Sequence, residues 1–253
     1  MSNLARGLLV PAVLLGAAEG AAQLSGMRSD AVAPPSAVIA AFRDLFTDRT
    51  IVIATLDTLT TTFAGLGLGG GFGLVLGLVF GLVRPLDRVT SPAIEIVRPI
   101  PSIALIPIAI IAFGFGYSME VYIVAFACLW PILILTRTAI SEIDPRLIEV
   151  SRVLRLTLIQ KVTKIVIPAV LPRIVVSIRL AAGVALVVAV TVEIAANPLG
   201  LGNAIMVAQQ SLRPAVMLAY LVWIGIVGFM LSAGLTLVQR HLLGRAAVIE
   251  AER

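Results

Sequence analysis

The sequence is short of charge, of cysteine and of histidine, and each shortage excludes a class of protein. Charged residues make up 13% of the 253 residues, about half of the roughly 25% that is usual in soluble domains. Cys128 is the one cysteine and His241 the one histidine. The chain can therefore form no disulfide within itself, and it can assemble neither a zinc site nor a catalytic triad. With 59% hydrophobic residues, the composition is that of a protein embedded in a bilayer.

The chain is basic, but its basic residues do not favour nucleic-acid binding. The formal net charge is +5, yet the Lys and Arg residues flank apolar runs and form no patch interleaved with aromatic residues. They distribute as the positive-inside rule expects. If the N-terminus is cytoplasmic, fourteen basic residues lie on the cytoplasmic side and four, Arg28, Arg43, Arg49 and Arg213, on the other. We therefore expect both termini in the cytoplasm.

A phosphate-binding glycine loop is also missing, although one stretch is rich in glycine. Eight glycines occur between Gly65 and Gly81, but no Lys-Ser or Lys-Thr pair follows them. Four of the glycines recur at every fourth position, which is the spacing of a small-xxx-small face that lets another membrane helix approach closely. The predicted packing glycines are Gly69, Gly73, Gly77 and Gly81.

Runs of about 20 apolar residues predict an all-α, polytopic membrane protein with about six transmembrane helices. The first run also resembles a signal peptide, but a membrane helix is the preferred interpretation. Residues 26–50 are polar and form an external segment with a short surface helix at 37–46. The loop at 197–203 is expected to be irregular or re-entrant. The predicted spans are 7–25, 51–83, 98–116, 119–139, 165–195 and 215–238.

The most informative segment is a polar one between two apolar runs, at residues 141–164. The spacing of Glu149, Ser151, Arg155, Ile165 and Pro168 resembles the EAA loop of ABC-importer permeases, in which an acidic residue and two small residues precede a glycine and an I-x-L-P sequence. In that family the loop carries a coupling helix that binds a cytoplasmic ATPase. The alternative is an ordinary basic cytoplasmic loop that leads into a helix with proline near its start.

Further motifs extend this resemblance over roughly residues 34–240. Together they resemble the permeases of the nitrate/sulfonate/taurine-type binding-protein-dependent ABC importers. They are Pro34-Pro35-Ser36, the R-P-I-P-x-x-A-x-x-P pattern at 98–107, F-G-x-G at 113–116 and G-L-G at 200–202. The resemblance implies one permease domain over 1–253, with its core at 51–240, in a bacterial inner membrane. It also implies a second copy of the permease, two ATPase subunits that bind ATP and Mg, and a periplasmic or lipid-anchored substrate-binding protein. This chain would itself hold no cofactor and catalyse no reaction.

The family pattern, placed on this sequence, predicts a set of coupling residues, and the sequence departs from the pattern at one of them. We expect Val150, Ser151 and Leu154 to form a compact contact face ringed by charge, because an unpaired charge at the centre of an interface is costly to bury. Arg155 stands where the family has glycine, so it favours a more continuous helix or a bend made by other residues. The predicted coupling residues are Glu149, Val150, Ser151, Arg152, Leu154 and Arg155.

Two charges inside the fifth span, Arg179 and Glu193, are candidates for the translocation path. They are 14 positions apart, which is close to four helical turns, so both can lie on one face. A charge at membrane depth is normally paired or faces water, so an ion pair between helices or a snorkelling side chain is the alternative. The predicted path residues are Pro101, Pro107, Arg179, Glu193, Gly200 and Gly202.

The function expected is import of a small organic or inorganic anion, such as a sulfonate, taurine or nitrate. Relatives of this type also carry neutral heterocycles and vitamins, so the solute stays open. Two other functions stay open as well. One is an ion-driven secondary transporter, which would usually show inverted repeats and buried acids near the midplane. The other is a membrane scaffold that transports nothing.

Overall fold

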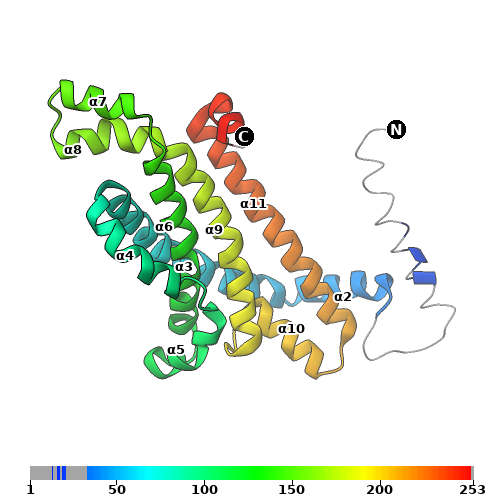
Figure 1. The fold of residues 1–253 in the computed structure, drawn as a ribbon. Helices are drawn as coiled ribbons and strands as arrows, with labels where there is room; N and C mark the ends of the chain where they lie inside the picture. Colours follow the sequence, from blue (N-terminus) through cyan, green and yellow to red (C-terminus); the bar gives the residue numbers. More distant parts are fainter. Residues whose placement is uncertain (1–12, 14–15, 18, 21–32, 252–253) are drawn as a thin grey trace.

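The computed structural model of the chain describes residues 13, 16–17, 19–20 and 33–251, and in this part the protein is helical without strands. The predicted all-α membrane fold is confirmed. Figure 1 shows long helices side by side, with short helices at both ends of the bundle. The elements are α2 (Pro35–Thr47), α3 (Thr50–Leu82), α4 (Arg84–Val97), η1 (Ser102–Leu105), α5 (Ile106–Phe113), α6 (Tyr117–Ser141), α7 (Pro145–Val153), α8 (Leu158–Lys161), η2 (Val162–Val166), α9 (Ile167–Ala195), α10 (Gly200–Gln210) and α11 (Pro214–Ala251).

The bundle has two distinct ends. α7 and α8 project from one end, which we call the loop end, and α5 and α10 lie at the opposite end, the α10 end (Figure 1). A core of buried side chains from α3, α6 and α9 fills the space between them, with Met119, Cys128 and Ala185 fully buried. A second core near the α10 end joins α2, α3, α10 and α11 around Ile51, Leu201 and Tyr220.

Among the described helices, α3 and α6 share the most extensive contact, and it uses the glycines of α3. A Cβ atom added at Gly69 would lie 2.0 Å from the Ala125 carbonyl oxygen, and one added at Gly73 would lie 2.6 Å from the Leu129 carbonyl oxygen. Gly77 and Gly81 approach α6 in the same way further along the helix. The contacts advance in the same direction along both helices, so α3 and α6 are parallel. Without glycine at these positions the two backbones could not come so close.

The helices that could span a membrane agree only in part with the prediction. Among the described residues, α3, α6, α11 and the segment Leu158–Gln210 are long and apolar enough. The pair formed by α4 and the segment Ser102–Phe113 adds a fifth if a broken helix is counted as one span. The first predicted span, at 7–25, lies largely outside the described residues. The number six therefore stays a prediction.

The third span predicted at 98–116 does not coincide with a single helix. Residues 84–97 already form a helix, α4, and α5 is only eight residues long. The two segments meet at 84°. Proline accounts for the break at Pro101 rather than at Pro99, because Arg98 keeps α-region backbone angles, whereas Pro101 is extended and has no N–H to continue the helix. Pro101 itself has extended backbone angles and begins η1.

The irregular segment predicted at 197–203 is shorter than expected, because α10 already starts at Gly200. Gly200 has a φ of +85°, a conformation that side-chain-bearing residues rarely adopt. A Cβ atom there would lie 2.0 Å from Glu193 Oε1. A glycine is therefore required where the chain leaves α9 and enters α10.

Candidate functional site

The polar segment at the loop end folds into two short helices joined by a tight turn. The Asp144 carboxylate accepts a hydrogen bond of 2.9 Å from the Arg146 backbone N–H, at the start of α7, where Pro145 needs no partner because it has no N–H. At the start of α8, Thr157 and Gln160 each accept a hydrogen bond from the other's backbone N–H and so form a capping box. The local sequence thus fixes both helix starts.

The turn between α7 and α8 is made by Arg155 itself. Its φ is +47°, which is the left-handed conformation that glycine adopts most readily. The Leu156 N–H donates to the Ser151 carbonyl oxygen across the turn, at 3.0 Å. The expectation that Arg155 favours a more continuous helix is therefore wrong, because the chain keeps the glycine-like bend and places an arginine in it.

We expect Arg155→Gly to stabilise the loop by about 1 kcal/mol, because a left-handed backbone costs a side-chain-bearing residue roughly that much. Hydrogen exchange of the amides at 154–158 measures the effect. Arg155→Ala is the matched control, since it removes the same charge but keeps the backbone strain, and it should slow exchange little or not at all. Equal protection in the two variants would contradict the role of backbone strain.

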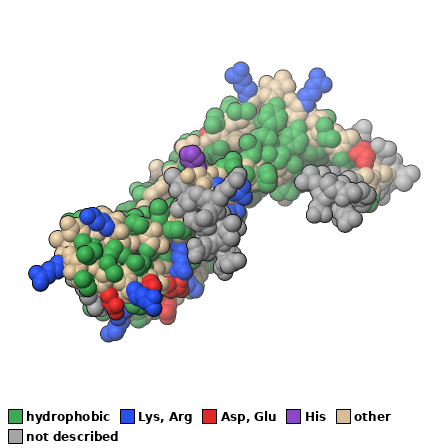
Figure 2. All heavy atoms as spheres, turned by 90° about the horizontal axis from the view of Figure 1, so that it is seen from above, with side chains coloured by type: hydrophobic (Ala, Val, Ile, Leu, Met, Phe, Trp, Pro, Cys, Tyr) green, Lys and Arg blue, Asp and Glu red, His purple; other side chains and the backbone are tan. Residues whose placement is uncertain are grey.

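The outward face of this segment is apolar, and we call it the loop strip. It consists of six exposed side chains on α7, the turn and α8, among which Val153 is 81% and Ile159 76% exposed. Figure 2, which views the molecule from above, shows hydrophobic side chains interspersed with basic ones over the lobe at the left, where α7 and α8 lie. The members of the loop strip are Leu147, Val150, Val153, Leu154, Leu158 and Ile159.

The structure places the predicted coupling residues on different sides of the loop. Val150 and Leu154 belong to the loop strip, and Glu149 and Arg155 are exposed. Ser151, however, is only 4% exposed, and its hydroxyl donates to the Ile148 carbonyl oxygen. The prediction that Ser151 belongs to the contact face is therefore wrong, because its side chain is buried on the inner side of α7, which contacts η2. The side chain of Arg152 lies outside the described part.

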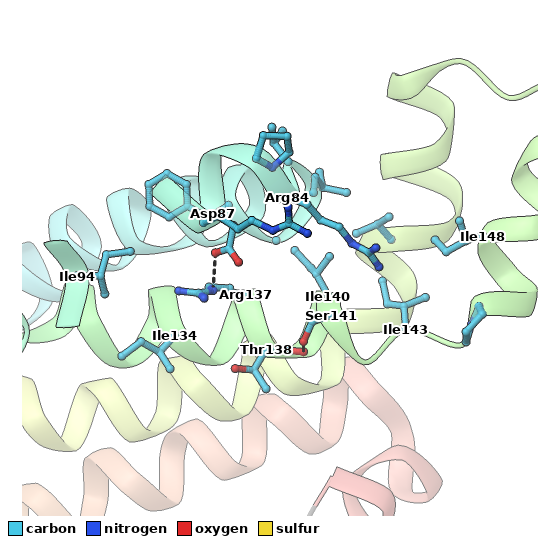
Figure 3. A pocket seen from close by; sticks show the side chains of 18 of the residues that line it. Arg84, Asp87, Ile94, Ile134, Arg137, Thr138, Ile140, Ser141, Ile143 and Ile148 are labelled. Carbon is cyan, nitrogen blue, oxygen red and sulfur yellow. Dashed lines mark hydrogen bonds and ion pairs between the residues drawn. The ribbon is translucent and has the colours of Figure 1, made fainter. Parts of the chain in front are cut away.

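A large cavity lies between the base of this loop, α4 and the end of α6. Its volume is 1160 Å³, and Figure 3 shows Ile143 and Ile148 of the loop facing Arg84 and Asp87 of α4 across it. We call it the loop-end cavity. Its charged lining residues are Arg84, Arg88, Arg98, Arg137 and Lys161, with Asp87, Glu95 and Glu149.

Basic groups outnumber acidic ones in the loop-end cavity, and only part of the charge is paired. Arg137 Nε lies 2.7 Å from Asp87 Oδ1 and its guanidinium also donates to the Ser91 hydroxyl at 2.9 Å, so it joins α6 to α4. In the described part of the chain, Arg84, Arg88 and Arg98 form no ion pair. A cavity with this balance attracts anions.

At the α10 end, buried polar side chains join four helices. Glu120 is fully buried and accepts hydrogen bonds from Thr61, at 2.5 Å, and from the amide of Asn197. Glu193 accepts from the Gly202 backbone N–H, at 2.8 Å, which caps the start of α10. The Leu201 N–H donates to the Thr58 hydroxyl at 2.9 Å. Because buried polar groups are costly to leave unpaired, these bonds fix α10 against α3 and α9.

The six predicted path residues do not form one group. Glu193, Gly200 and Gly202 meet where α9 passes into α10, whereas Pro101 and Pro107 are exposed at the break between α4 and α5. Arg179 lies partly buried near the middle of α9. Its 14-residue separation from Glu193 corresponds to about 21 Å along the helix. The two side chains therefore cannot pair with each other.

Several residues at these sites carry no clear signal in the sequence. A single acid at the start of an apolar run, as at Glu120, is typical of a helix end at the membrane surface. Asparagine before proline, as at Asn197, is a common turn signal. Val153, Leu158 and Ile159 fall next to the family motif, and their exposure in a charged loop was a signal that could have found them.

The fold is known from solved transporters. The chain resembles the MetNI methionine ABC transporter in an inward-facing form, with a TM-score of 0.68, 24% identity and coverage of 76% of this chain and 95% of that one. An amino acid ABC transporter crystallised with histidines gives a TM-score of 0.60 at 19% identity, over 79% of this chain and 98% of that one. At these identities the likeness shows the fold, which is that of an ABC-transporter permease.

Sequence comparisons agree with this class. A protein named as an aliphatic sulfonates transport permease, SsuC of Bacillus subtilis, is 28% identical over 94% of this chain and 86% of its own length. The bicarbonate transport system permease CmpB of Synechococcus elongatus is 29% identical over 78% of this chain and 71% of its own. The taurine transport system permease TauC of Escherichia coli is 27% identical over 78% of this chain and 72% of its own length.

The all-α membrane fold, the projecting polar loop and the relatives together define the class of this protein. It is a transporter subunit that crosses the membrane. The chain belongs to the family of binding-protein-dependent transport system inner membrane components, whose sequence pattern matches residues 69–248. It is thus a permease subunit of an ABC importer.

Proposed function

We propose that the chain forms the translocation path for a small anion, such as a sulfonate, taurine or nitrate, and that it is driven by ATPase subunits bound at the loop end. The loop end then faces the cytoplasm together with both chain termini, and the α10 end faces the substrate-binding protein outside. ATP and Mg bind to the ATPases. ATP binding changes the conformation of the translocation path because the ATP-bound ATPases bind one conformation of the permease more tightly than the other.

The observation that carries this proposal is the loop strip. Six exposed apolar side chains on two short helices that project from the bundle (Figure 1) are unfavourable in water. Four of them, on α7 and the turn, lie outside the candidate spans, and Leu158 and Ile159 are the first residues of the segment Leu158–Gln210. A soluble partner that covers them explains their exposure. The charged residues around them, including Glu149 and Arg155, supply the polar rim that protein interfaces have. The experiment that tests the proposal is uptake of radiolabelled sulfonate or nitrate by membrane vesicles that contain the permease, its ATPases and its binding protein.

The charge of the loop-end cavity supports an anion as the solute, in keeping with the names of the sulfonate, taurine and bicarbonate relatives. We expect Arg88→Glu to lower anion uptake roughly tenfold, since a two-unit change of charge inside a cavity shifts local anion concentration by about that factor. Arg43→Glu is the control, because Arg43 is exposed on α2, outside the lining of the cavity. Unchanged uptake in Arg88→Glu, with the ATPases still bound, would remove the cavity from the path. The partly buried Arg179 stays a proposed path residue.

We expect two copies of the chain in the assembled importer. One copy has one loop strip, whereas two ATPase subunits offer two binding grooves, and twofold pairing is the usual way to double a site. Native mass spectrometry of the complex should give a permease mass twice that of the 26.6 kDa chain. One copy beside a different permease would contradict a homodimer and leave the coupling mechanism intact.

A further inference from the structure

One ion pair lies within the lining of the loop-end cavity, between Arg137 of α6 and Asp87 of α4 (Figure 3). Arg137 is the one basic residue of α6, and that helix is a candidate span. A charged side chain within a span is costly, so it is normally paired, faces water or belongs to a path for polar solutes. The Arg137 side chain is 30% exposed and the Asp87 side chain 26%. Both groups are therefore within reach of water in the cavity.

The contacts of Arg137 with α4 use only part of its guanidinium. Nε lies 2.7 Å from Asp87 Oδ1, and Nη2 donates to the Ser91 hydroxyl at 2.9 Å. The Nη1 atom forms no hydrogen bond or ion pair with any described residue. A guanidinium carries five N–H donors in a planar fork, which can hold two oxygen atoms of one oxyanion. Arg137 therefore has donors left for an oxyanion in the cavity.

The ion pair itself is held weakly. Asp87 Oδ1 is buried but, within the described part of the chain, accepts no hydrogen bond, so it is bound to Arg137 by charge alone. Partly exposed ion pairs add little net stability, so another anion can replace the carboxylate at small cost. Arg84, Arg88 and Arg98 line the same cavity and raise the local concentration of anions beside the pair.

We propose that Arg137 binds the anionic group of the solute in the loop-end cavity, and that Asp87 competes with the solute for the guanidinium. Asp87 holds the guanidinium in position while no solute is bound. An oxyanion that enters the cavity takes over the N–H donors, and the bond to Ser91 still joins α6 to α4. The inference rests on the proposed import function and adds the residue that binds the solute at the loop end.

Calorimetric titration of the purified permease–ATPase complex with ethanesulfonate tests both roles. Arg137→Lys keeps the charge but removes the planar fork. It should weaken binding of ethanesulfonate at least roughly tenfold, because charge-assisted bidentate hydrogen bonds are among the strongest. Binding of chloride, which has no pair of oxygen atoms to match the fork, should change by about threefold at most.

Asp87→Asn removes the competing charge and keeps nearly the same shape. It should tighten binding of ethanesulfonate at least roughly tenfold, because the solute then meets a guanidinium without a bound carboxylate. Glu95→Gln is the matched control, since Glu95 lines the same cavity and, in the described part of the chain, forms no ion pair. It removes the same charge and should tighten binding by only about threefold, through the general potential of the cavity.

The two substitutions at the ion pair should thus change binding in opposite directions, which a pair that only joins α4 to α6 would not do. Weaker or unchanged binding in Asp87→Asn would overturn the competition, and so would equal tightening in Glu95→Gln. Unchanged binding of ethanesulfonate in Arg137→Lys would overturn the role of the guanidinium.

Vesicle uptake tests the import function separately from this site. Sulfonate uptake that neither Arg137→Lys nor Asp87→Asn alters would leave the import function standing and reject the Arg137 site. The predicted pattern of binding, without uptake of sulfonate or nitrate by the unmodified importer, would support the site and reject the proposed function.

Discussion

Gly69→Ala is expected to destabilise the permease by at least about 3 kcal/mol, the upper part of the range for overpacking. The added methyl group would lie 2.0 Å from the Ala125 carbonyl oxygen and 2.7 Å from its Cα atom. Both are backbone atoms, so no side-chain rotation relieves the clash, and α3 and α6 must separate. Separation also weakens the packing of Leu66, Val124 and Cys128 in the core between the helices. The measurement is the unfolding midpoint of the purified protein in detergent.

Gly71→Ala is the matched control for this substitution. It makes the same chemical change two residues away in the same helix, but a Cβ atom at Gly71 meets nothing within 4 Å. Because alanine favours the helix by up to about 1 kcal/mol over glycine, the control should be neutral or slightly stabilising. An equal loss of stability in both variants would show that α3 and α6 do not pack through this glycine face.

The second large effect concerns the loop strip. Val153→Asp and Ile159→Asp should each abolish co-purification of the ATPase subunits, because an unpaired carboxylate at the centre of an interface costs several kcal/mol. That penalty corresponds to a loss of affinity of at least roughly a hundredfold. Both side chains are exposed, Val153 lies outside the candidate spans, and Ile159 is the second residue of the segment Leu158–Gln210. The permease itself should therefore insert and fold normally.

Thr163→Asp is the control for the loop strip. Thr163 is exposed on the adjoining η2 segment, and its hydroxyl donates to the Ile159 carbonyl oxygen rather than to the strip's side chains. The control should retain the ATPases. Retention of the partner by all three variants would exclude the loop strip as the coupling surface. Glu149→Lys should have a smaller effect, since it inverts a charge at the rim.

The position of the coupling loop could be predicted from sequence, but its faces could not. Charge is conspicuous in a chain with so few charged residues, so the loop stands out. Which side chains face outward depends on the left-handed turn at Arg155, and neither composition nor spacing reveals that a non-glycine residue adopts it. The sequence therefore predicts Ser151 on the contact face and gives no sign that Val153 belongs there.

The helices were predictable where the apolar signal is long and uninterrupted. The prediction at 51–83 gave α3 to within a residue at each end, because nothing in that run competes with the helix. The segment after it mixes charge with prolines, and there the amphipathic α4 was missed. None of its residues is fully buried, so the tertiary contacts that would mark it as helical are few.

The buried polar network at the α10 end was the least predictable part. Glu120, Asn197 and Thr61 come from three segments, and no sequence spacing relates them. Glu193 was singled out as a charge at membrane depth, but sequence alone does not show that it caps α10 through the Gly202 N–H. Such contacts depend on the folded arrangement of α3, α6, α9 and α10.

Site-specific cross-linking of the loop strip tests the central claim most directly, namely that this permease is driven through α7 and α8. Cys128 is the one native cysteine and is fully buried, so Val153→Cys supplies one reactive position for a thiol-attached photo-cross-linker. We predict that it captures the ATPase subunit in the assembled importer, while Ile111→Cys, equally exposed on α5 at the other end, does not. Failure of position 153 to capture the ATPase, with capture from position 111, would contradict the account.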